Sequence, residues 1–355
     1  MTGNAAFLGS KESEALGVME KWVNKTGGIR NRPIHFVIAD DASDPKQSVQ
    51  LTAVLVERHV PVLIGSSVSA MCAAMAPLVE KTGPLTYCLS PLIEPPPGSY
   101  VFSAAIGSKQ FMPLLPQYAR KRGWKRLAIM MSLDTTGQDY EAKLDAVLKT
   151  PDGAGVSIVR REHFQNNDLS VAAQLANIKA SQPDVIVTTA TGPAFGMILR
   201  AIKESGLEVP VLGPGSNMTY AQLAQFASFL PKTMYFISAA GAKPDPAAKG
   251  AWKAAQSAFV DAFRLAGIRS EYSHVLVWDP AMFIVDALRK VGPDATAAQL
   301  HDYVQQLKVW HGNDGPYDFR AYPQRGLGPG AACVYEWVTA KNDYSVVARG
   351  QEPAR

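Results

Sequence analysis

The chain of 355 residues is long enough for two domains, each with a core that folds without disulfide or metal staples. Hydrophobic residues make up 47% and charged residues 19%, which excludes a disordered chain, and no apolar run reaches the roughly 20 residues of a membrane-spanning helix. The 35 Lys and Arg residues exceed the 31 Asp and Glu residues by a scattered net charge of only +4, so no nucleic-acid partner is predicted.

The first part of the chain alternates helical and strand periodicities. Apolar residues recur at helical spacing over residues 12–25, which predicts a helix with one apolar face. The nearly continuous apolar stretch 34–39 predicts a strand buried on both faces of a parallel sheet. The same pattern then continues with a helix over 45–57, a strand over 62–64, a helix over 71–78 and a strand over 85–89.

A helix near 108–121 leads into a second series of the same kind. Strands are predicted at 127–131, 156–160, 184–189, 209–212 and 234–238, with helices at 139–149, 171–181, 194–205 and 219–228 between them. Three helices at 247–267, 275–291 and 296–307 and short strands near 315–319 and 331–338 complete the chain. Strict alternation of strands and helices predicts an α/β fold of two doubly wound, parallel-sheet lobes.

Motifs of known catalytic and cofactor sites are missing from the sequence. The stretch 65–69 ends in Ser where a nucleophile elbow needs Gly, and the glycines of 213–215 lack the third glycine of a dinucleotide loop. The six histidines show no metal-ligand spacing, and Cys72, Cys88 and Cys333 form no C-x-x-C pair. We therefore predict neither an enzyme, nor a cofactor, nor a metal site. Whether Cys72 and Cys88 are bridged or free is left open.

Three loops that follow predicted strands are the candidate ligand contacts. In doubly wound sheets, ligands bind outside the carboxyl ends of the strands, and the start of a helix attracts anions. The serines of 66–69 open a helix, where they either bind a carboxylate or merely cap the helix. The loop 90–95 offers an apolar wall or is a plain turn, and 213–217 offers polar contacts.

Short stretches along nearly the whole chain share their residues with one protein family. They are Thr2-Gly3, Ala5 to Gly9, Asn24 to Ile29, Asp40 to Pro45, Leu63 to Gly65, Ser90-Pro91, Thr191 to Pro193, Leu212 to Pro214 and His311-Gly312. In this order they resemble the type I periplasmic solute-binding proteins, and most closely the leucine/isoleucine/valine-binding family of ABC importers. The resemblance implies two lobes joined by three hinge crossings, with residues 1–120 plus 243–322 in one and 121–242 plus 328–355 in the other.

The same resemblance implies a set of ligand-binding residues. Ser69 matches the serine that takes the ligand carboxylate in amino-acid-binding members, Leu8 matches a large side chain over the ligand, and Trp278 matches a pocket aromatic. Thr136 and Thr191 match positions where those members carry tyrosines. The complete expected set is Leu8, Ser67, Ser69, Ser90, Leu92, Ile93, Thr136, Thr191, Ser216 and Trp278.

Gly215 departs from the family pattern, because amino-acid binders carry an acidic residue there. A buried ammonium without a counter-ion is costly by several kcal/mol. The resemblance and this departure together imply a small carboxylate with an apolar or aromatic body and no amine. Two alternatives stay open: a hydrophobic or branched-chain amino acid with Glu94 as relocated counter-ion, and a ligand-sensing receptor domain.

The resemblance also carries expectations about partners and location. It implies a periplasmic monomer that delivers its small-molecule ligand to an ABC permease in the membrane. Family members begin with a central strand directly before the Thr-Gly loop, and the chain has no residues for it. Its loss would leave two unpaired strand edges in a core. We therefore expect the native gene product to have further N-terminal residues, with that strand and an export signal.

Overall fold

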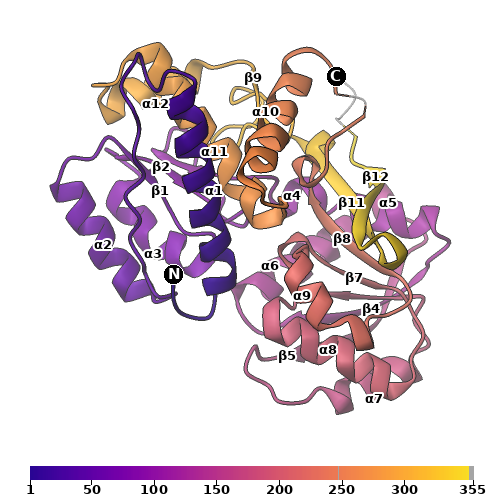
Figure 1. Cartoon of the computed structure of the whole chain (residues 1–355). Coiled ribbons are helices and arrows are strands. Elements are labelled where there is room, and N and C mark those ends of the chain that lie inside the picture. The colour runs from indigo at the N-terminus through magenta and orange to yellow at the C-terminus, as the bar shows by residue number, and fades with distance from the viewer. Residues whose placement is uncertain (247, 352–355) are drawn as a thin grey trace. The chain divides into compact units, whose positions relative to one another are not determined.

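The computed structural model describes residues 1–246 and 248–351 in two compact units (Figure 1). Unit 1 comprises Met1–Gly107 and Ala240–Gly328, and unit 2 comprises Ser108–Ala239 and Pro329–Arg355. The chain first passes from unit 1 to unit 2 between Gly107 and Ser108. The resemblance implies this crossing near residue 120. The reason for the earlier crossing is packing, because the Phe111 ring contacts the Tyr140 ring at a tilted angle, and Tyr118 meets Tyr235 edge-on, all within unit 2.

Unit 1 is an α/β layer structure whose sheet is short. Its three strands pair in parallel in the order β1-β2-β3. Helix α1 packs against α10 and α11, and α2 packs against α3 (Figure 1). The elements are α1 Ala6–Lys25, α2 Pro45–Glu57, β1 Val62–Ile64, α3 Ser69–Val79, β2 Leu85–Cys88, β3 Val101–Ser103, α10 Gly250–Ala266, α11 Tyr272–Val291, α12 Ala297–Gln306, β9 Trp310–His311 and β10 Pro316–Tyr317. The helix predicted from residue 247 begins at Gly250, and residue 247 itself lies outside the described part.

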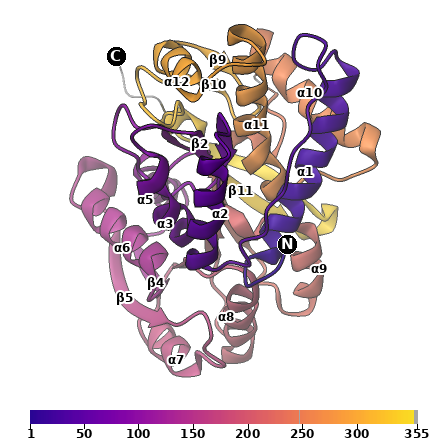
Figure 2. The same ribbon diagram turned by 90° about the vertical axis from the view of Figure 1, so that its left-hand side faces the viewer.

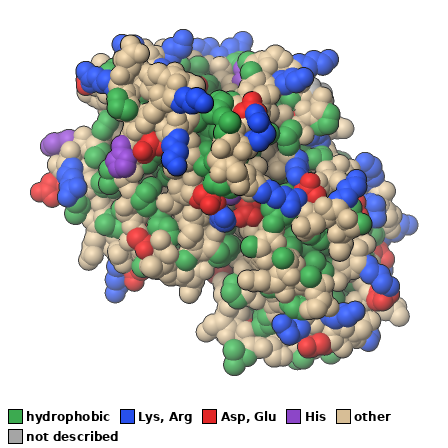
Figure 3. All heavy atoms as spheres, in the orientation of Figure 1, with side chains coloured by type: hydrophobic (Ala, Val, Ile, Leu, Met, Phe, Trp, Pro, Cys, Tyr) green, Lys and Arg blue, Asp and Glu red, His purple; other side chains and the backbone are tan. Residues whose placement is uncertain are grey.

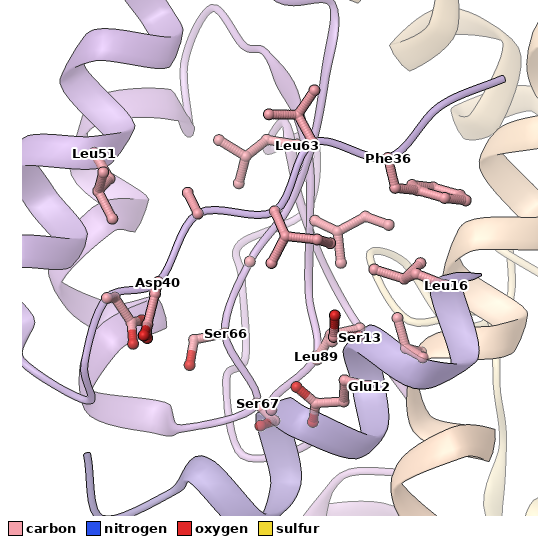
Figure 4. Close-up of a pocket in the computed structure, with 18 of the residues that line it drawn as sticks. Glu12, Ser13, Leu16, Phe36, Asp40, Leu51, Leu63, Ser66, Ser67 and Leu89 are labelled. Carbon is pink, nitrogen blue, oxygen red and sulfur yellow. The ribbon is translucent and has the colours of Figure 1, made fainter. Parts of the chain in front are cut away.

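The strand predicted over 34–39 is wrong as an element. These residues are extended, yet they form no ladder with a strand in the described chain. Val37 is 82% exposed and Ile38 is 43% exposed. A channel of about 530 Å³ lies between this segment and β1 (Figure 4). The apolar run has the extended backbone that its sequence predicts. A strand also needs a neighbouring strand within hydrogen-bonding distance, and the channel separates this segment from β1.

A disulfide lies in the core of unit 1. Cys72 on α3 is bonded to Cys88 at the end of β2, and both residues are fully buried. Leu63 and Met75 belong to the same buried cluster. Of the two states that the sequence left open, the structure therefore has the bridged one, which ties helix α3 to the sheet.

Unit 2 has one seven-stranded sheet in the order β12-β11-β8-β7-β6-β4-β5. The predicted parallel series is confirmed for β4 to β8, whereas β11 and β12 pair antiparallel at one edge. Sequence periodicity missed β12. The elements are α4 Ser108–Phe111, α5 Leu114–Lys121, β4 Arg126–Ser132, α6 Thr135–Leu148, β5 Ser157–Phe164, α7 Ala172–Ala180, β6 Val185–Thr188, α8 Gly192–Ser205, β7 Val211–Pro214, α9 Tyr220–Gln225, β8 Met234–Ala239, β11 Ala332–Val338 and β12 Asp343–Arg349.

One face of the molecule can be compared with the scattered charge of the sequence. Basic and acidic side chains are interspersed over the face that Figure 3 shows, without a field of one sign. No helix in the described chain is long and apolar enough to cross a membrane. The amino terminus lies beside the lower ends of α1 and α2 in both ribbon views, and the Met1 ammonium is 4.0 Å from a carboxylate oxygen of Asp40 (Figures 1 and 2).

Candidate functional site

Two serines from different loops meet at the carboxyl edge of the unit 1 sheet. Strands β1 and β2 pair in register, Ile64 opposite Tyr87, so the loops that follow them lie side by side. Ser69 opens α3, and its Oγ lies 2.8 Å from the Oγ of Ser90, which follows β2. Ser90 is fully buried, whereas Ser69 is partly exposed. The sequence proposed both residues, and the structure brings them together.

The start of α3 carries no side-chain cap. Its N-cap is Val68, whose side chain offers no acceptor, and the Ser66 hydroxyl accepts a hydrogen bond from the Val68 N–H rather than from the helix. The first N–H groups of a helix have no intrahelical acceptor, and they favour an anion there. Ser69 is therefore not the N-cap of α3. The Ser69–Ser90 pair lies at a helix N-terminus that no side chain caps.

A buried guanidinium that the sequence reading missed fixes the neighbouring loop. Arg325 is 4% exposed and donates to the main-chain carbonyl oxygens of Ile93 at 2.7 Å, Ala104 at 3.2 Å and Ala105 at 3.3 Å. Burial lowers the pKa of Arg325 to about 10, and the negative charge of Glu94 opposes that shift. Arg325 therefore holds the loop 90–95 in place, and Glu94 already faces a cation.

Leu8 and Ser67 lie near a buried carboxyl group. Leu8 and Glu12 are one turn apart on α1, and both are buried. Burial raises the pKa of Glu12 to about 7, the Ser67 hydroxyl lowers it, and the charge of Asp41 adds to the rise. Glu12 was not among the predicted residues, although its spacing from Leu8 places the two side chains on one helix face.

Three apolar residues of the expected set differ in their exposure and in what they pack against. Ile93 packs against the disulfide-containing core cluster, and Leu92 is partly exposed. Trp278 is only 2% exposed and meets Phe259 edge-on at 5.3 Å. The Trp278 ring thus takes part in the packing of α10 on α11.

The unit 2 residues share one edge of their own sheet. Thr136 lies in the first turn of α6 after β4, Thr191 precedes α8 after β6, and Ser216 follows β7; all three are partly exposed. The fully buried Asn217 donates to the Ala190 carbonyl at 2.8 Å. This amide fixes the loops after β6 and β7 to one another, a structural role for a residue that the sequence had offered as a ligand contact.

Gly215 has no room for a side chain. A Cβ atom added there would lie 2.7 Å from both the Cβ and the Oγ of Ser238 on the neighbouring strand. Such an approach forces a shift of Ser238 or of the loop. The close packing against Ser238 of β8 therefore leaves no space for an acidic side chain at position 215.

A pair of buried carboxyl groups joins three segments of unit 1. Asp279 accepts hydrogen bonds from the main-chain N–H groups of Asn313 at 2.7 Å and Asp314 at 2.8 Å, and from the Tyr317 hydroxyl at 3.0 Å. Asp314 in turn accepts the Gly241 N–H at 2.9 Å. Burial raises the pKa of Asp279 to about 6, and burial together with the Asp279 charge raises that of Asp314. Every bond of this network stays inside the protein, which indicates a structural role.

Metal binding finds no support in the described residues, where no three His, Cys, Asp or Glu side chains gather in a way that could hold an ion.

The chain is similar to periplasmic binding proteins. The sequence profile described as periplasmic binding protein matches residues 1–342. The leucine-, isoleucine-, valine-, threonine- and alanine-binding protein of Pseudomonas aeruginosa is 24% identical over 220 residues, which are 60% of this chain and 58% of that protein. The matched part is thus little more than half of that relative.

Two solved structures share the fold across almost the whole chain. An extracellular ligand-binding receptor from Rhodopseudomonas palustris superposes with a TM-score of 0.84 at 19% identity, covering 98% of this chain and 97% of that one. A fatty acid ABC transporter substrate-binding protein from Thermomonospora curvata superposes with a TM-score of 0.81 at 18% identity, covering 99% and 90%. The predicted two-lobed α/β fold is confirmed by these similarities.

Proposed function

The chain belongs to the periplasmic binding protein family, and we propose that it is the extracytoplasmic solute-binding component of an ABC importer, with a small hydrophobic or aromatic carboxylate as its solute. It binds the solute as a monomer, without chemical change, and delivers it to the permease in the membrane. A dissociation constant near micromolar, about −8 kcal/mol, suits a carrier that must also release its load.

The observation that carries the proposal is the Ser69–Ser90 hydroxyl pair at the open start of α3. One hydroxyl of the pair donates to the other, and the remaining hydroxyl donor and the free N–H groups of the helix N-terminus suit a carboxylate, because hydrogen bonds to a charged group contribute about 1.5–3 kcal/mol each. Ser67, Leu8 and Leu92 supply the adjoining contacts. On unit 2, Thr136, Thr191 and Ser216 lie at one polar edge of their own sheet.

Two features favour a solute without an amine. Gly215 leaves no acid where amino-acid binders keep one, and the space for such a side chain is taken by Ser238. The alternative counter-ion, Glu94, acts on the buried guanidinium of Arg325. Neither position thus supplies a counter-ion for an ammonium group, and leaving an ammonium buried alone would cost several kcal/mol. The remaining carboxyl group beside Ser67 is that of Glu12, whose pKa burial raises to about 7, so its charged form is disfavoured.

A hydrophobic amino acid is the second candidate, because the Pseudomonas relative is named for five amino acids. A ligand-sensing receptor is a third, supported by the name of the Rhodopseudomonas neighbour. The name of the Thermomonospora neighbour supports the amine-free carboxylate instead, since a fatty acid has an apolar body and no amine.

A thermal-shift screen at pH 7 tests the proposal. Benzoate, phenylpropanoid acids and 4-methylpentanoate are compared with phenylalanine and leucine. A solute at 100 times its dissociation constant stabilises the folded state by about 2.7 kcal/mol, which is visible in the melting temperature. Stabilisation by the plain acids alone supports the proposal. Stabilisation by the amino acids alone would contradict it and would support a hydrophobic amino acid as the solute.

A further inference from the structure

A buried histidine closes the first turn of helix α11. The His274 side chain is completely buried, and it occupies the third helical position after the N-cap residue Glu271. Its Nδ1 accepts a hydrogen bond from the Glu271 N–H at 3.0 Å, while the Glu271 side chain accepts from the main-chain N–H of His274. These two reciprocal bonds form a capping box, which supplies acceptors for N–H groups that the start of a helix leaves unpaired.

The other nitrogen of the same ring ties α11 to α1, the helix that packs along it in unit 1 (Figure 1). The Nε2 atom of His274 lies 2.8 Å from Oε2 of Glu14, and the same oxygen accepts a hydrogen bond from the Lys11 ammonium at 2.9 Å. The imidazole ring also contacts the Phe263 ring of α10, with the ring centroids 4.8 Å apart. One side chain therefore caps α11, binds α1 and contacts α10.

The two hydrogen bonds of the ring fix its protonation state. Because Nδ1 faces an N–H donor, it carries no hydrogen, and the one hydrogen of the neutral imidazole is on Nε2, where it is donated to Glu14. A second proton would have to be added at Nδ1. Two hydrogens would then face each other across the 3.0 Å contact with the Glu271 N–H. The imidazolium form of His274 is thus incompatible with the capping box.

The charges around the ring come from α1 and from the N-cap residue. Burial of the ring lowers the pKa of His274 below its ordinary value of 6.5, the hydrogen bond and the charge of Glu14 raise it, and the charge of Lys11 lowers it. The Phe263 ring on α10 carries no charge. Because the folded state holds this proton less strongly, the contribution of His274 to stability is complete above pH 6.5 and is lost as the pH falls below it. The other charged side chains at the end of α10 and in the segment before α11 are at least partly exposed: Asp261, Arg264 and Arg269.

We propose that His274 is a pH-sensitive latch, in which protonation of Nδ1 opens the first turn of α11 and loosens the attachment of α11 to α1. The neutral ring holds both helices at once, through its acceptor on one side and its donor on the other. In the protonated ring the Glu271 N–H has lost its acceptor, and a charged imidazolium is disfavoured in a buried site. The latch acts within unit 1, and this inference does not rest on the proposed function.

Nuclear magnetic resonance of the imidazole nitrogens tests the protonation states in the wild-type protein. The His274 signals are assigned through the contact of its ring with Phe263. At about pH 7.5 we expect an unprotonated Nδ1 and a protonated Nε2, and on acidification a titration with a pKa below 6.5. A protonated Nδ1 at neutral pH would overturn the proposal. So would a pKa at or above 6.5, because it would show that the ion pair with Glu14 outweighs burial.

Hydrogen–deuterium exchange measures the opening itself. The amides of Glu271, His274 and Val275 are hydrogen-bonded in the capped turn. After correction for intrinsic exchange, their protection should fall by about tenfold or more between about pH 7.5 and pH 5, because paired amides exchange only when the structure opens. In His274→Gln the protection should change by less than about threefold, because Gln at this position of a capping box accepts the same N–H and does not titrate. Equal losses in both proteins would contradict the latch.

The variant Glu14→Gln separates a latch from a merely structural histidine, and it decides the matter even where His274→Gln folds poorly. Gln keeps an oxygen that can accept from Nε2 and removes the charge that raises the pKa of His274. We expect the pKa of His274 to fall further, and the loss of amide protection at the start of α11 to move to lower pH by the same amount. A pKa that moves while the exchange transition stays in place would show that another group opens the turn, and the proposal would be wrong.

Discussion

The hydroxyl oxygens of Ser69 and Ser90 lie 2.8 Å apart although 21 positions separate the residues in the chain. The contact exists because β1 and β2 are parallel neighbours whose carboxyl ends meet at one edge. The disulfide from α3 to β2 holds the same two elements. The proposed solute site is thus supported by the core beneath it.

Removing either hydroxyl should weaken solute binding. Ser69→Ala deletes a donor to the carboxylate, a loss of about 1.5–3 kcal/mol or roughly 10- to 100-fold in affinity, and Ser90→Ala deletes the hydroxyl that positions Ser69, so it should also weaken binding. Isothermal titration calorimetry with the solute found in the screen measures it. Ser66→Ala, in the same loop, is the matched control and should change affinity by less than about threefold.

Replacing Arg325 should destabilise unit 1. Arg325→Met leaves three buried carbonyl groups, of Ile93, Ala104 and Ala105, without their donor, at about 1–3 kcal/mol for an unpaired buried group. Lys cannot span all three acceptors, so Arg325→Lys should restore only part of the stability. Urea unfolding gives both values, and wild-type stability of the Met variant would contradict the assigned role.

Because of the raised pKa of Glu12, we expect the free energy of unfolding to fall as the pH rises. Its pKa is raised from 4.5 to about 7 in the folded protein, so the folded state holds the proton more strongly. The contribution is fully present below pH 4.5 and is lost as pH rises through 7, by up to about 3 kcal/mol. Buried Asp279, with a pKa of about 6, acts in the same direction.

The difference between wild type and Glu12→Gln isolates the Glu12 part. Chemical unfolding of both proteins from pH 4 to pH 8 should show the variant losing less stability across that range. Parallel pH profiles for the two proteins would contradict the burial of Glu12.

A methyl group should have opposite effects at two glycines. Gly215→Ala places a Cβ 2.7 Å from Ser238 and should destabilise the protein by about 1–3 kcal/mol. Gly17, in the middle of α1, has no atom within 4 Å of such a Cβ, so Gly17→Ala should stabilise it by about 0.5–1 kcal/mol. Melting temperatures of the two variants check the pair, and a shift of the same sign in both would refute the packing assigned to Gly215.

Much of the fold followed from periodicity, and the misses have physical causes. The apolar run 34–39 reads as a strand in any sequence analysis, but pairing depends on a neighbour that local sequence does not reveal. Strand β12 was missed because its pattern is only half-buried: Tyr344 alone is fully covered. The antiparallel pairing of β11 with β8 depends on how the chain returns from unit 1 to unit 2 at Pro329, and local sequence does not show this.

The proximity of Ser69 and Ser90 could be predicted from the sequence, because each residue follows one of two neighbouring parallel strands. The sequence shows least where tertiary packing decides. The resemblance implies that Trp278 is a pocket aromatic, and the sequence does not show that its ring also meets Phe259 edge-on. Arg325 lies far from the loop 90–95 in sequence, and only the folded chain brings its guanidinium to the Ile93 carbonyl.

The most direct measurement is a calorimetric titration of one matched pair of solutes, 3-phenylpropanoate and phenylalanine, which differ only in the amine. We expect the plain acid to bind with a dissociation constant near micromolar and the amino acid at least about 100-fold more weakly, because its ammonium would be desolvated without a counter-ion. Tighter binding of phenylalanine would contradict the account and would show that the site supplies a carboxylate for the amine.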